Sequence, residues 1–383
     1  MHKPTSDCRA TERKPPWPMV RLGDVCEMIS SRGHQIKQSE ILPEGKYPVV
    51  SQSENEIEGF SNKEICIADV PVILFGDHTC NVKLVNKPFV VGADGTKLIK
   101  SIMHCVQYLY YCLQLLGLKL QDGKYRRHFG DLCGSEIPLP PLSVQREIVA
   151  RLERELAAVE KMKKGFEALA ETAKAEFKAE LKEVFEEISR GGAETRRLGE
   201  VCDVRDGTHD TPVKCDKGYL LLTSKNVRNG KVDKANAYYI SASDYASINK
   251  RSGVDRWDVL FSMIGTVGET AIVDKTPDFA IKNMGLFKTH ANELLARWIK
   301  YYFDSQLAKQ LILDRMKGSN QKFLSLGALR EFPLTLTNRD SMIRLVSRLD
   351  GARVKAEKLE SKALEGVAVC EAMRKAILKE AFE

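Results

Sequence analysis

Two short segments carry basic and amide side chains that suit contact with a nucleic acid. They consist of Lys124, Tyr125, Arg126, Arg127 and His128, and of Asn320, Gln321 and Lys322. Arginine and lysine neutralise phosphates or bind guanine N7 and O6, whereas asparagine and glutamine match adenine N6 and N7. A solvated charge run would explain either segment alone. Because both occur at the same place in a duplicated pattern, we predict that both bind DNA.

Further polar residues lie beside predicted turns, where loops could reach into a DNA groove. These are His78, Lys83, Lys225, Asn226, Arg228, Lys282 and Asn283. Taken singly, each fits ordinary protein surface better than a base contact, so these residues are secondary candidates. The histidines His34, His104 and His209 have no neighbouring ligand residues in the sequence and are interpreted as structural.

The chain lacks the motifs of common catalytic sites. It contains no glycine-rich dinucleotide or phosphate loop, no zinc-protease motif and no amino-methylating motif. Its ten cysteines are scattered singly without a CxxC pair. Cys26 and Cys202 occupy equivalent places and are expected to be small buried side chains. We predict no catalytic residue, no metal and no cofactor on this chain.

The sequence motifs of the elements that would position these residues are repeated along the chain. Arg21-Leu22-Gly23-Asp24-Val25-Cys26 returns as Arg197-Leu198-Gly199-Glu200-Val201-Cys202, and Glu136-Ile137-Pro138-Leu139 returns as Glu331-Phe332-Pro333-Leu334. The repeat is far longer than the roughly 20 to 50 residues of a solenoid unit. It therefore indicates duplication of a whole domain together with its helix.

The repeat predicts a tandem organisation of six parts. We expect a flexible head over 1–16, a globular module over 17–140, a long helix over 141–190, a linker over 191–196, a second module over 197–332 and a second long helix over 333–383. Each module alternates short β-like runs with turns and contains one shorter helix, near 102–116 and 292–314 respectively. We expect an α+β or mixed α/β fold in both modules.

Each long helix carries an apolar stripe at spacings of three and four residues. In the first helix the stripe runs from Val149 to Ile188, and in the second from Val346 to Ile377. Such stripes are unstable in water, so we predict that the two helices pair as an antiparallel coiled coil. The alternatives are dimerisation with a second copy and docking of helices from another protein. A helix of about 45 residues would be near 65 Å long.

Composition is compatible with a DNA partner but does not establish one. The chain has 383 residues, 43% of them hydrophobic, and a formal net charge of +7. This mild excess of positive charge also serves solubility. The sequence contains neither an apolar run of membrane-spanning length nor a signal-peptide pattern, so we expect a cytoplasmic protein without a membrane partner.

The whole pattern resembles the specificity (S) subunit of type I restriction-modification systems, over nearly the full chain after Pro16. The resemblance rests on the two opening motifs, on the segments 125–153 and 257–268, and on Gly318-Ser319-Asn320-Gln321-Lys322-Phe323-Leu324-Ser325-Leu326. The most specific signal is the proline hinge Pro140-Pro141, followed by a glutamine and a long helix. The second hinge lacks the paired prolines.

The resemblance implies a non-catalytic subunit that directs chemistry performed by its partners. Each module would be a target recognition domain for one half of a split, asymmetric duplex sequence, and the coiled coil would set the gap between the halves. Two modification (M) subunits, which carry S-adenosylmethionine and methylate adenines, and restriction (R) subunits would assemble on it. A coiled-coil scaffold that binds proteins through its modules is the alternative, and it predicts no salt-sensitive affinity for duplex DNA.

Overall fold

The computed structural model describes residues 17–92, 95–102, 104–121, 123–124, 126–318 and 322–383. These residues form two compact units, one made of residues up to Glu167 together with Leu364–Glu383, the other of Ala168–Ala363. The expected flexible head over 1–16 lies outside the described residues.

In the first unit, an antiparallel four-stranded sheet has the order β2-β8-β5-β6, and a three-stranded sheet has the order β4-β3-β7. The strands are β1 (Met19–Arg21), β2 (Cys26–Ile29), β3 (Tyr47–Val50), β4 (Gly59–Ser61), β5 (Val72–Gly76), β6 (Val82–Val85), β7 (Val90–Val91), β8 (Thr96–Ser101) and β9 (Glu136–Pro138). The helices are α1 (Leu22–Val25), η1 (Gln38–Glu40), α2 (Val106–Leu120) and α3 (Phe129–Gly134). A separate ribbon pairs β1 with β9.

The second unit repeats this topology. Its sheets have the orders β11-β19-β16-β17 and β15-β12-β18, and β10 pairs with β20. The strands are β10 (Glu194–Arg197), β11 (Asp203–Asp206), β12 (Tyr219–Leu222), β13 (Val227–Arg228), β14 (Lys231–Val232), β15 (Tyr238–Ile240), β16 (Val259–Ser262), β17 (Thr270–Ile272), β18 (Phe279–Ile281), β19 (Met284–Lys288) and β20 (Pro333–Leu336). The helices are α5 (Leu198–Val201), η2 (Ser224–Asn226), α6 (Ala242–Ser252), α7 (Glu293–Asp304), α8 (Gln306–Arg315) and α9 (Leu326–Arg330).

Matching contacts support the duplication at the level of single bonds. The hydroxyl of Tyr108 on α2 donates to the carbonyl of Pro138 at 2.8 Å, and Tyr302 on α7 donates to the carbonyl of Pro333 at 2.6 Å. Each bond ties the module's helix to the strand that leads toward the long helix. Cys26 and Cys202 are both buried, as expected, and burial raises the pKa of each thiol to about 12.

The shorter helices differ from their predicted bounds for local reasons. Ser101 exchanges hydrogen bonds with the backbone of His104, which closes a turn, so α2 begins only at Val106. The predicted helix over 292–314 is interrupted at Ser305, whose hydroxyl accepts from the amide of Ala308 and caps α8. A serine that caps a new helix is favoured at such a break.

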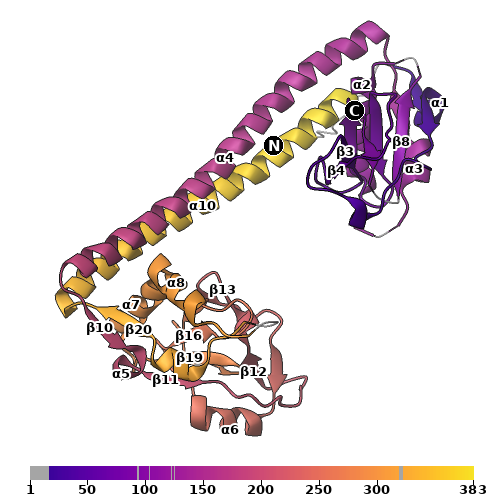
Figure 1. Cartoon of the computed structure of the whole chain (residues 1–383). Helices are drawn as coiled ribbons and strands as arrows, with labels where there is room; N and C mark the ends of the chain where they lie inside the picture. The colour runs from indigo at the N-terminus through magenta and orange to yellow at the C-terminus, as the bar shows by residue number, and fades with distance from the viewer. Residues whose placement is uncertain (1–16, 93–94, 103, 122, 125, 319–321) are drawn as a thin grey trace, which may run out of the picture. The chain divides into compact units, whose positions relative to one another are not determined.

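The long helices are α4 (Leu142–Arg190) and α10 (Arg339–Phe382), which lie side by side and run antiparallel within each unit (Figure 1). In the first unit Arg151 faces Glu380 at 3.6 Å. In the second unit Lys174 faces Glu360 at 3.4 Å and Arg344 faces Glu187 at 2.7 Å. The expected intramolecular pairing of the helices is confirmed. None of the helices in the described ranges is long and apolar enough to cross a membrane.

Gln145 fixes the start of α4 against the first module. Its side chain is buried, accepts from the amide of Cys105 at 3.1 Å and donates to the carbonyl of Pro140 at 2.9 Å. One glutamine therefore caps α2 and holds the proline hinge. In the second module, residues 333–336 form β20 and α10 begins at Arg339.

The far end of α10 completes the core of the first unit. Leu378 and Phe382 are buried among residues of α2 and α4, and the Phe382 ring meets that of Tyr108 at 5.4 Å in an edge-on contact. We expect Phe382→Ala to lower the free energy of unfolding of this unit by about 3–5 kcal/mol, because it removes a buried ring and leaves a cavity. Hydrogen exchange of α2 amides measures this loss. Glu380→Ala on the exposed face is the control, and an equal effect of both variants would contradict the packing.

Candidate nucleic-acid interface

The first basic segment is anchored by Asp77, which follows β5. The backbone amide of His128 donates to the carbonyl of Asp77 at 2.9 Å, and the amides of His128 and Phe129 donate to its carboxylate at 3.1 and 2.9 Å. Asp77 is buried, so this one side chain caps the start of α3 from a distant turn. A ring nitrogen of His78 also lies 3.2 Å from the carbonyl oxygen of Arg126.

In the second module, the residues that follow Lys322 are held at the equivalent place. The amide of Leu324 donates to the carbonyl of Met263, the residue equivalent to Asp77, at 3.0 Å. Phe323 pairs with Lys317 and forms an isolated bridge with Ile264. In both modules the residues that directly precede the short helix therefore lie against the turn after the central strand, β5 or β16.

The exposed candidates of the two segments are Lys124, Arg126, Arg127 and Lys322. Arg126 pairs with Asp131 of α3, which holds its guanidinium near the segment's surface. His128, in contrast, is buried, so its side chain supports the segment in this conformation and does not face solvent. The candidates Tyr125, Asn320 and Gln321 lie outside the described residues.

Most of the remaining candidates of the second module line one hollow of about 810 Å³. Lys225, Asn226, Arg228 and Asn283 contribute to its lining, together with the turn at Gly265 and Thr266. Lys225 and Arg228 are exposed, whereas Asn226 is buried. The amide of Asn226 donates to the carbonyls of Asp233 and Ala235, so its role in this conformation is to shape the loop. Lys282 lies next to the group and donates to the hydroxyl of Thr211.

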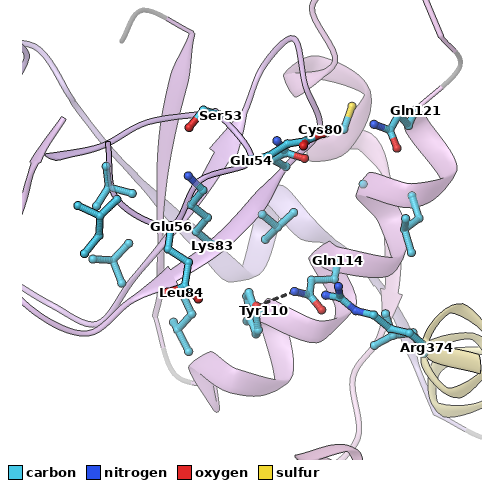
Figure 2. A pocket seen from close by; sticks show the side chains of 18 of the residues that line it. Ser53, Glu54, Glu56, Cys80, Lys83, Leu84, Tyr110, Gln114, Gln121 and Arg374 are labelled. Atoms are coloured by element: carbon cyan, nitrogen blue, oxygen red, sulfur yellow. Dashed lines mark hydrogen bonds between the residues drawn. The ribbon is translucent and has the colours of Figure 1, made fainter. Parts of the chain in front are cut away.

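In the first module, Lys83 lies in a separate hollow of about 850 Å³. Figure 2 shows this pocket with Lys83 and Glu56 on one side and Tyr110, Gln114 and Arg374 on the other. The ammonium of Lys83 donates to the carbonyls of Ser51 and Asn55, and burial lowers its pKa. No described residue of the first basic segment lines this pocket. Lys83 is therefore not brought together with Arg126 and Arg127.

The loops that do meet in the first module involve Gln52 and His78. The amide of His78 donates to the side-chain oxygen of Gln52 at 3.3 Å, and Thr79 and Asn81 donate to the Gln52 carbonyl at 2.8 and 3.0 Å. The loop after β3 and the turn after β5 are thus tied together. Gln52 is not among the residues predicted from the sequence, because no motif marks it.

Asn229 and Asn236 are hollow-lining residues that the sequence analysis missed in the second module. Both have left-handed backbones, with φ of 51° and 61°, as does Asn283 with φ of 52°. Asparagine tolerates this conformation better than most residues. Isolated asparagines between strands would have been the signal, but the turn chemistry alone explains them equally well.

We expect Asp77→Ala to loosen the first basic segment without affecting the second module. The change removes a buried acceptor that serves two backbone amides, and loss of hydrogen bonds to a charged group costs about 1.5–3 kcal/mol each. Faster hydrogen exchange of the amides of 126–134 is the expected result. Asp77→Asn keeps an acceptor and should be milder. Unchanged exchange in Asp77→Ala would show that the carboxylate does not hold this segment.

The site contains no arrangement suited to metal chemistry within the described ranges, where no group of three or more histidine, cysteine or acidic side chains could hold an ion. What it offers instead is exposed cations and amides on loops, supported by buried polar anchors. This arrangement can bind phosphates and base edges. The fold therefore defines a class of protein with two similar α+β modules. Each module is followed by a long helix, and the two long helices pair.

Comparison with known families identifies this class. Residues 15–166 and 191–340 both match the family model described as "Type I restriction modification DNA specificity domain". The chain belongs to this family and is a DNA specificity subunit of a type I restriction-modification system, the non-catalytic member of such a complex.

Individual relatives are distant in sequence. The chain is 23% identical over 372 residues to the type I restriction enzyme MjaVIII specificity subunit of Methanocaldococcus jannaschii, covering 87% of this chain and 85% of the relative. It is 23% identical over 278 residues to the EcoKI specificity subunit of Escherichia coli K12, covering 64% and 56% respectively. A solved chain from work on complex assembly and conformational transition of the type I R-M system has a TM-score of 0.68 at 20% identity, covering 96% of this chain and 98% of that one. This last likeness supports the fold.

Proposed function

We propose that the chain recognises an asymmetric, bipartite duplex sequence, with one half-site read by each recognition domain, 17–140 and 197–332. The linker 191–196 and the long helices would join them, and the helix pair would set the gap between the half-sites. The observation that supports this proposal is the equivalent backbone bond, from His128 to Asp77 and from Leu324 to Met263, at or just after the basic segment of each module. Because the segments differ in sequence, the two half-sites differ too.

The partners in this proposal are double-stranded DNA, two M subunits and R subunits, acting in the cytoplasm. Adenine methylation would use S-adenosylmethionine bound to the M subunit. Support comes from the solved relative, which belongs to work on assembly of a type I system.

The experiment is to co-express the chain with its M subunit in a host free of adenine methylation and to map modified adenines by long-read sequencing. The expected result is one bipartite motif with a fixed gap. An assembled complex that modifies no defined sequence would contradict the proposal and would favour the protein-binding scaffold.

A further inference from the structure

His209 lies between two oxygen atoms at the edge of the second module. Its Nε2 is 2.9 Å from a carboxylate oxygen of Asp206, and its Nδ1 is 2.8 Å from the amide oxygen of Asn283. Asp206 ends β11, and Asn283 forms the turn between β18 and β19. From the sequence alone, His209 is interpreted as a structural residue without nearby ligands. The fold instead brings it into contact with a candidate DNA-reading residue.

Two hydrogen bonds hold the backbone of Asn283, so only its side-chain amide group can turn. Its N–H donates to the carbonyl of Thr208 at 3.1 Å, and its carbonyl accepts from the hydroxyl of Ser224 at 3.2 Å. The residue lines the 810 Å³ hollow beside Lys225 and Arg228. The edge of the amide that does not face His209 is therefore available to a ligand in that hollow.

The protonation state of His209 decides which edge that is. A carboxylate only accepts hydrogen bonds, so Nε2 must donate to Asp206 in either state of the ring. When Nδ1 also carries a proton, it donates to the Asn283 oxygen and leaves the amide N–H groups pointing away. When Nδ1 is unprotonated, it accepts from the Asn283 amide nitrogen, and the amide oxygen then points away.

Other charged residues lie near Asp206, His209 and Asn283. Arg251 of α6 lies 3.6 Å from the second carboxylate oxygen of Asp206 and donates to the carbonyl of Gly207. Asp210 follows on the loop of His209 and receives a bond from Thr208, and Lys282 precedes Asn283 and donates to Thr211. The carboxylate of Asp206 thus contacts both the His209 ring and the Arg251 guanidinium.

We propose that His209, held by Asp206, is a positioning residue that sets which edge of the Asn283 amide meets DNA and thereby tunes the base preference of the second half-site. This inference rests on the proposed function. Amide N–H groups fit acceptors such as guanine O6, thymine O4 and purine N7, whereas the amide oxygen fits adenine N6 or cytosine N4 amino groups. The amide edge that His209 selects therefore sets the preference at one base pair.

The first test maps methylation by the complete complex that contains His209→Ala, with Asn283→Gly for comparison. Glycine keeps the left-handed backbone at 283 and removes only the amide. Both variants are expected to relax the motif at the same single position of the second half-site, with the first half-site unchanged. His290→Asn is the control, because His290 is an exposed histidine of the same module with a left-handed φ of 53°.

The second test measures binding of the complex to the cognate duplex and to one substituted at that base pair. His209→Ala should discriminate between the two duplexes roughly 10-fold less than the unmodified chain does. His209→Gln still offers an amide to Asn283, so it should retain most of the discrimination that His209→Ala loses. Asp206→Asn weakens the contact that holds the ring and should have an intermediate effect.

The outcomes separate the two proposals. A bipartite motif and a discrimination between the two duplexes that both stay unchanged in His209→Ala would overturn the role of His209 and leave the proposed function intact. Absence of any defined motif for the unmodified complex would overturn both. Loss of the whole second half-site in His209→Ala, with His209→Gln behaving the same way, would show a purely structural role.

Discussion

Replacing Arg126 and Arg127 with alanine is expected to abolish recognition of the first half-site while the second is still read. Both guanidinium groups are exposed on the segment anchored by Asp77, and each good bidentate contact to a base contributes about 1–3 kcal/mol of discrimination. Loss of about 2 kcal/mol is about a 30-fold loss of affinity. The affinity of the assembled complex for the cognate duplex, compared with its affinity for duplexes altered in one half, gives both the loss of discrimination and the loss of affinity.

The control removes the same charge elsewhere on the module. Lys46 and Lys63 form exposed ion pairs with Glu64 and Glu40, so Lys46→Ala with Lys63→Ala has the same charge change as the arginine variant. If the arginines contact phosphates rather than bases, the logarithmic salt dependence of binding should fall by up to about 1.8, without a change in preferred sequence. If the lysine and arginine variants bind alike, neither arginine belongs to the interface.

Shortening both long helices by one heptad is expected to move methylation to targets with a shorter gap. Residues 164–170 and 364–370 are suitable because the ion pairs Lys163–Glu371 and Lys174–Glu360 flank them and can re-form. Seven helical residues span about 10.5 Å, which corresponds to at most about three base pairs. Methylation at the original gap should disappear, and long-read sequencing of the modified genome would report the new one.

The matched variant removes only residues 164–170. The ion pairs of the two helices then cannot all keep their partners, so we expect a less stable chain rather than a new gap. An unchanged gap after the paired deletion, in a folded complex, would contradict the role of the helices as the spacer.

The sequence predicted the duplication and the paired helices because both leave periodic signals. Repeated motifs mark the two sheets, and the apolar stripe marks the seam of the helix pair. The stripe was less reliable at single positions: the spacing of three and four residues also places Met162 and Met373 on it, yet their side chains are 42% and 40% exposed. A pair of helices covers only a narrow seam, so side chains at its margin remain open to water.

The candidate site was harder to predict because burial of a loop side chain depends on contacts distant in sequence. His128 and Asn226 have the chemistry of DNA-contacting residues, yet Asp77 binds the backbone of the first and the loop carbonyls of 233 and 235 occupy the amide of the second. The contact of His209 with Asp206 and Asn283 has the same origin. Its partners come from two different strand ends, which periodicity does not bring together.

The packing of Phe382 against Tyr108 also constrains the order in which the two modules fold during synthesis of the chain. On the ribosome, α2 and the start of α4 emerge long before the end of α10. Part of the apolar surface of the first module therefore stays exposed to solvent until α10 has been made. The second module, in contrast, draws its core from a continuous stretch of chain. We therefore expect the second module to reach its native packing before the first, which reverses the order of synthesis. A pulse-labelled, stalled nascent chain lacking α10 should be sensitive to protease within α2.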